Sequence, residues 1–153
     1  MQAASTPLSG GRWVPFNETW AFQGIDLTGA VFAMQIRLTP DAPGVPLVDL
    51  GTVTTAGTQG LRLIYAGTAT VSAHLAAGRL MRDEIAAGVA DSDNLTLSQV
   101  GVRINETTME GLPFPAERGD DNPLAWDFHV TPSGQLKQLW AGGSFTVLAG
   151  VTA

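Results

Sequence analysis

Asp127 and His129 are the side chains whose types and spacing come closest to acid–base chemistry. They stand two residues apart in a run where apolar and polar residues alternate, so both point to one side of an extended strand. A carboxylate beside an imidazole suits general acid–base catalysis. The polar face of an ordinary sheet produces the same pattern, and we favour that interpretation because such pairs are commonly structural. The chain has no Gly-x-Ser-x-Gly elbow and no cysteine, so we expect no catalytic residues and no enzyme activity.

Two acidic loops offer the oxygen ligands that calcium prefers. They span residues 91–94 and 120–122. Neither has the EF-hand spacing, in which Gly stands at the sixth position and Glu at the twelfth. Asp and Asn are also frequent in solvated turns, because their side chains bond to nearby backbone amides. Phosphate-loop and dinucleotide fingerprints are missing as well, and we expect neither a metal nor a cofactor.

The chain carries little charge for its length. Only 14% of its 153 residues are charged, against about a quarter in a typical soluble domain. The net charge is −6 and Lys137 is the single lysine, so the clustered cations that nucleic acid requires are missing. No segment approaches the ~18 consecutive apolar residues of a membrane helix. We expect a neutral surface suited to contact with other proteins, and no nucleic-acid or membrane partner.

The length of the chain fits a single domain. Residues 1–11 are small and polar and include Gly and Pro, which predicts a flexible N-terminal arm. The domain then covers residues 12–153. The start of the chain lacks the basic residues and apolar run of a signal peptide, so we expect synthesis in a cytoplasm without export by the general route.

Alternating apolar residues predict a chain made mostly of strands. The clearest case is residues 31–38, where Phe32, Met34, Ile36 and Leu38 fall on one face. Glycine, proline and aspartate punctuate the segments between the strands. Further strands are expected over residues 12–23, 47–50, 61–65, 68–72, 95–104, 124–130, 136–140 and 144–148.

One segment departs from this pattern. Residues 74–87 are rich in alanine and leucine and predict a helix, which Gly88 is placed to end. The next strand changes phase near residues 98–99, which suggests a β-bulge. A single helix is too little for repeated parallel crossovers. The residues therefore predict a β-sandwich or small barrel with one short helical insertion.

The four tryptophans divide into two groups. Trp20, Trp126 and Trp140 lie in strand-like runs, which favours burial in the core. Trp13 lies next to the expected arm, and tryptophan is enriched where proteins contact one another. We assign Trp13 and Phe16, from the same aromatic segment, as candidate partner-binding residues.

Several landmarks at the two ends of the chain are familiar. An aromatic first strand leads into residues 26–30 (Asp-Leu-Thr-Gly-Ala) and 32–37. Residues 126–134 and 143–147 follow near the end, and the chain closes with Gly-Val-Thr over residues 150–152. This pattern resembles small virion proteins from the tail or late structural modules of tailed bacteriophages. It is also similar to the immunoglobulin-like N-terminal modules of phage baseplate upper proteins, which carry a comparable Asp-Leu-Thr-Gly turn.

The resemblance implies an immunoglobulin-like β-sandwich that works in assembly and has no catalytic residues. It implies an adaptor in the tail or baseplate that anchors fibres or other components through protein–protein contacts. Its partners would be other virion subunits, with homo-oligomers around a symmetric tail, and its location the virion after synthesis in the host bacterial cytoplasm. A capsid decoration or cement protein and a carbohydrate- or receptor-binding module are the alternatives. A glycan hydrolase is weaker, because no acidic pair suggests a cleft.

Overall fold

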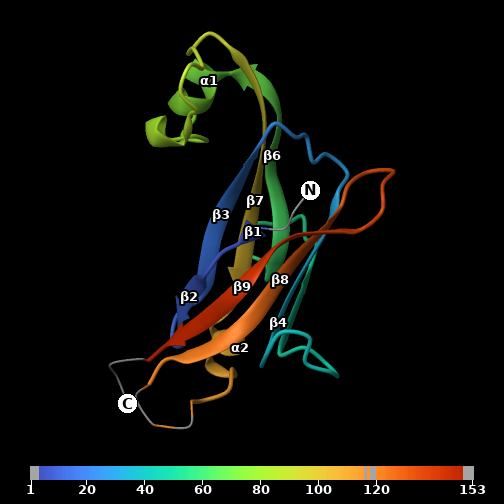
Figure 1. The fold of residues 1–153 in the computed structure, drawn as a ribbon, viewed down its shortest axis with the longest axis vertical. Helices are drawn as coiled ribbons and strands as arrows, with labels where there is room; N and C mark the ends of the chain where they lie inside the picture. Colours follow the sequence, from blue (N-terminus) through green and yellow to red (C-terminus); the bar gives the residue numbers. More distant parts are fainter. Residues whose placement is uncertain (1–3, 116, 118–119, 150–153) are drawn as a thin grey trace.

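A computed structural model describes residues 4–115, 117 and 120–149, and these form two β-sheets (Figure 1). Strands make up 48% of the structure and helices 10%, which confirms a mostly-β fold. Two sheets that face one another suit a β-sandwich or half-barrel.

The larger sheet, sheet A, has six strands. β8 lies between β9 and β4, β5 forms one edge, and β1 and β2 both pair with β9 at the other edge. β1 and β2 run parallel to β9, whereas the other pairs are antiparallel. The strands are β1 (Ala4–Ser5), β2 (Leu8–Gly11), β4 (Val31–Arg37), β5 (Val48–Gly51), β8 (Asn122–Thr131) and β9 (Gln138–Leu148).

The smaller sheet, sheet B, has three antiparallel strands in the order β3-β7-β6. They are β3 (Phe16–Gln23), β6 (Gly60–Thr70) and β7 (Asn94–Ile104). A bridge between Thr52 and Leu61 joins the two sheets where β5 leads into β6. The helices are α1 (Val71–Ala76), the 3₁₀ turn η1 (Arg82–Glu84) and α2 (Glu106–Glu110). α1 and α2 lie at opposite ends of the molecule (Figure 1).

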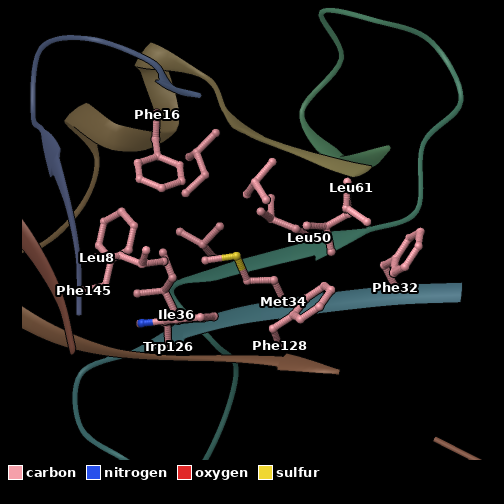
Figure 2. Packing of buried hydrophobic residues seen from close by; sticks show 14 of the residues in the cluster. Leu8, Phe16, Phe32, Met34, Ile36, Leu50, Leu61, Trp126, Phe128 and Phe145 are labelled. Carbon is pink, nitrogen blue, oxygen red and sulfur yellow. The ribbon is translucent and has the colours of Figure 1, made fainter. Parts of the chain in front are cut away.

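The core lies between the inner faces of the two sheets. Phe128 from β8 is fully buried and its ring centroid is 5.2 Å from that of Trp20 and 6.0 Å from that of Phe22, both on β3. Phe16 and Phe145 make a second contact, with centroids 5.2 Å apart, and Figure 2 shows their rings side by side. The alternation expected for residues 31–38 holds through Ile36, but Leu38 lies past the end of β4 and is 56% exposed.

The structure corrects the expected arm over residues 4–11. These residues form β1 and β2, and Leu8 is buried in the core. The Thr6 amide donates to the Gly142 carbonyl, and the Thr6 carbonyl accepts the indole N–H of Trp126 at 3.0 Å. The small residues that predict flexibility instead let this segment lie against the edge of β9. Residues 1–3 of the expected arm are outside the described range.

Residues 61–72 also differ from expectation. Instead of two strands joined at Ala66 and Gly67, β6 is continuous and pairs with β7 along its length. The register shifts between Leu63 and Tyr65, so the bulge expected near residues 98–99 lies on the partner strand opposite them. A bulge points both of its residues to one side, which moves the apolar positions of β6 from the inner to the outer face.

The helical insertion covers this outer face at the far end of the β6–β7 hairpin. The helix expected over residues 74–87 spans only Val71–Ala76, because Gly78 takes a φ of +72° and stops it. Four buried residues around the insertion lie outside the main core cluster: Val71, His74, Leu80 and Leu97. His74 bonds to the Leu95 carbonyl through Nε2 and accepts from Arg79 at Nδ1, so both ring nitrogens are satisfied.

Candidate functional site

A buried arginine organises the end of the sandwich that carries α2. Arg12 is only 4% exposed, and its guanidinium donates to the carbonyls of Leu112 and Pro113 just beyond the helix. Helix C-termini leave carbonyls without partners, so a cation is favourable there. The guanidinium also lies 4.1 Å from the ring centroid of Phe114. Arg12 thereby holds the segment after α2 against the chain that follows β2.

Three exposed apolar residues lie close to this arginine, two of them just after it in the sequence and one in the segment after α2. Trp13 is 43% exposed, Val14 is 53% exposed and Phe114 is 70% exposed. We call these three residues the apolar end. Because Arg12 ties both segments to a buried anchor, the apolar end belongs to a fixed part of the structure and offers aromatic surface at little entropic cost.

The structure separates the two candidate contact residues. Phe16 is 4% exposed and packs against Phe145, so it belongs to the core and has little surface to offer a partner. Trp13 lies at the surface, where its partner role stays a prediction. The other tryptophans follow the expectation of burial: Trp126 and Trp140 are buried, and Trp20 is half-buried against the core. Sequence patterns missed Arg12 and Phe114, because nothing in the local sequence shows that they meet.

Asp127 and His129 lie side by side on the outer face of β8. The Asp127 Oδ1 and His129 Nδ1 atoms are 3.6 Å apart, and both side chains are partly exposed. Their strand neighbours Gln35 and Ala33 lie on the same open sheet face. Gln35 in turn accepts from Arg37 and donates to Asp49. The pair thus belongs to a polar sheet face, the arrangement favoured by its alternation.

The acidic loops use their carboxylates locally. Asp91 receives two hydrogen bonds from Arg82, which hold the pKa of that carboxyl below its usual range, and Asp93 accepts from the Ala90 amide. Asp121 accepts from the Ala149 amide. Within residues 4–115, 117 and 120–149, no group of three or more His, Asp and Glu side chains is placed to hold a metal ion.

A groove lies on the outer face of sheet B. It has a volume of about 300 Å³. Its floor holds Asn17 and Thr19 from β3, Gly101 and Arg103 from β7, and Gly60, Arg62 and Ile64 from β6, with residues 56–58 as a wall. Both arginines are half-buried. Each arginine occupies an outward position of its strand, which the alternation of the sequence indicates. That the two arginines are near each other follows only from the register of β6 on β7.

Neither a protein-family model nor a curated protein sequence matches this chain. Among the described helices, none is long and apolar enough to span a membrane.

Proposed function

We propose that this protein is a non-enzymatic virion structural component of a tailed phage, an adaptor that joins tail or baseplate components through protein–protein contacts. The apolar end carries the proposal. Exposed aromatic side chains next to a buried, hydrogen-bonded arginine form the kind of rigid anchor that dominates protein interfaces. The low overall charge adds support, because charged residues are depleted at the centre of such interfaces.

The same proposal extends to the fold type, the oligomeric state, the location and the partners of the protein. The sandwich is of the immunoglobulin-like type, as the resemblance of residues 26–37 and 126–134 implies. The protein forms homo-oligomers around a symmetric tail, and its location is the virion. Its partners are other virion subunits.

Virion incorporation tests the role. Antibody against the protein should label the tail or baseplate of phage particles by immunogold microscopy. A phage that carries Trp13→Ala together with Phe114→Ala should incorporate at least about tenfold less protein, since each truncation at a contact centre costs about 1 kcal/mol or more. Leu136→Ala is the matched control, because Leu136 is 86% exposed and precedes the start of β9, whereas the β2 residues just before Arg12 pair with the end of β9. Absence of the protein from particles would overturn the proposal.

Two alternative functions would give distinct experimental outcomes. Labelling confined to the head would identify a capsid decoration protein. A carbohydrate- or receptor-binding module would bind on a glycan array and lose that binding on truncation of Trp13. The burial of Trp126 and Trp140 leaves few aromatic rings for stacking on sugars, which favours the adaptor.

A further inference from the structure

The groove on the outer face of sheet B has a regular layout. Across the strands, Asn17 pairs with Arg103 and Arg103 pairs with Gly60. One step along, Thr19 pairs with Gly101, which pairs with Arg62. The arginines are therefore diagonal neighbours, and each stands beside a glycine. Diagonal partners on a sheet face lie within reach of long side chains, so the two guanidinium groups can converge on one ligand group.

Gly101 keeps the floor of the groove open, since a side chain there would meet Ile64 at 3.0 Å. Gly60 has a different role: it lets the backbone of β6 lie against the Gly51 carbonyl and Val53, which a side chain at Gly60 would overlap. The bulge directs Ile64 outward, where it closes one end of the floor. The wall of residues 56–58 is tethered, because Gln59 accepts the Asn105 amide and Asn105 accepts the Arg103 Nε–H at 3.1 Å.

The charges in the groove are unopposed. No acidic residue lines it, and within residues 4–115, 117 and 120–149 no carboxylate forms an ion pair with Arg62 or Arg103. In a chain of net charge −6, two half-buried guanidinium groups without counter-charge form a local positive site. Arginine binds carboxylates through paired N–H donors, and Asn17 and Thr19 add neutral hydrogen-bonding groups beside them.

We propose that this groove binds a carboxylate side chain of an extended acidic segment from a partner protein. The proposal names the chemistry of a partner and so rests on the contact role proposed above. β3 borders the groove, and among the described strands it pairs only with β7, so its other edge can receive an added strand. The groove contains no aromatic ring on which a sugar would stack, which favours a peptide over an acidic glycan.

Direct binding of the purified protein tests this. The probe is a fluorescent peptide of alternating Thr and Glu, and the matched peptide has Gln in place of every Glu. We expect the Glu peptide to bind and the Gln peptide to bind at least about tenfold more weakly, since glutamine cannot form the charge-assisted hydrogen bonds that a carboxylate makes with arginine. Arg62→Gln and Arg103→Gln should each cause a similar loss. Arg82→Gln, which removes an exposed arginine elsewhere, should leave binding unchanged.

A second variant tests the groove without removing charge. Gly101→Val fills the floor and should also weaken binding, with circular dichroism to verify that the fold is retained. No binding of the Glu peptide at low ionic strength would overturn the proposal, as would equal binding by the double arginine variant. If the groove binds oligogalacturonate, an acidic glycan, and does not bind the peptide, the proposal of a protein partner is wrong. Virion incorporation is a separate measurement. Failure of peptide binding would leave the adaptor role standing, and failure of virion incorporation would leave the peptide-binding result standing.

Discussion

The two sheets use the same alternation for opposite purposes on their outer faces. On sheet A, Arg37 donates to Gln35 and to the carbonyls of Ala42 and Gly44. The guanidinium of Arg37 is therefore occupied by acceptors of its own sheet and of the loop that follows β4. Asp127 Oδ1 lies 3.6 Å from His129 Nδ1 and accepts no hydrogen bond within the described residues. On sheet B, Arg62 and Arg103 face an open floor without acidic neighbours. An outward charge becomes a candidate site when its neighbours leave it unpaired.

The sheets also differ in how they end. Sheet A is closed by β1 and β2, which add to β9 and seal the edge of the core. Sheet B continues past the sandwich as the paired strands β6 and β7, which lead to α1 (Figure 1). The buried residues around this insertion lie outside the main core cluster. We expect local stability to differ along the molecule, with the sandwich more stable than the helical insertion beyond β6 and β7.

The largest effect should follow from Phe128→Ala, which removes the ring that joins the two sheets. Phe128 is fully buried against aromatic residues of β3 and β4. The cavity should lower the free energy of unfolding by about 3–5 kcal/mol, measured by chemical denaturation. Leu136→Ala, at an 86% exposed position, should change it by less than about 0.5 kcal/mol. Equal effects would show that the sheets do not share this core.

Gly143→Ala tests the sealed edge of sheet A. Gly143 has a φ of +154°, and a side chain there would overlap the Thr6 carbonyl. We expect a loss of about 1–3 kcal/mol in unfolding free energy from this backbone strain, with faster hydrogen exchange at the Thr6 amide. Gly51→Ala is the control, since no atom lies within 4 Å of a side chain there. Unchanged exchange at Thr6 would contradict the pairing of β1 with β9.

His74→Ala tests the far end of sheet B. The substitution leaves the part-buried Leu95 carbonyl without the imidazole donor and removes the hydrogen-bond acceptor of Arg79. We expect about 1–2 kcal/mol of destabilisation from the lost bond. Hydrogen exchange should rise at Val71 while Val100 stays protected. Equal loss of protection at both residues would show that the insertion and the sandwich unfold as one unit.

The smallest effect should come from Asp26 in the turn that links β3 to β4. The hydroxyl of Thr28, at 2.6 Å, and its amide, at 2.9 Å, donate to Asp26 Oδ1 and lower the pKa of this carboxyl from its ordinary 3.8. Because the folded pKa lies below the unfolded one, the stabilisation is present above pH 3.8 and is lost as the pH falls through the folded pKa.

Thermal melts across this pH range measure the contribution. The melting temperature of Asp26→Ala should fall slightly below that of the wild type at neutral pH, and the difference should shrink under acid conditions. Thr28→Val removes the hydroxyl donor and should reproduce part of the same change. A difference that stays constant with pH would contradict the assignment to ionised Asp26.

Sequence alternation alone determined the strand content, the inward positions of residues such as Met34 and Phe128, and the burial of Trp126 and Trp140. These follow from local spacing, because a strand places every second side chain on one face. Glycine and other small residues predicted flexible or turn segments at places where pairing with another strand decides the structure. Residues 4–11 form strands because β9 offers an edge, and Gly67 lies within β6 because the β7 pairing continues through it.

Only the tertiary structure decided which residues meet across the chain. Arg12 reaches the carbonyls after α2 over about a hundred positions of sequence separation. Arg62 and Arg103 become diagonal neighbours only through the register of β6 on β7. Phe16, assigned to a partner surface on residue type, packs in the core because its strand parity directs it inward. Long-range pairing is a global property of the fold. The sequence therefore shows the chemistry of each side chain, but it does not show which distant residues that side chain contacts.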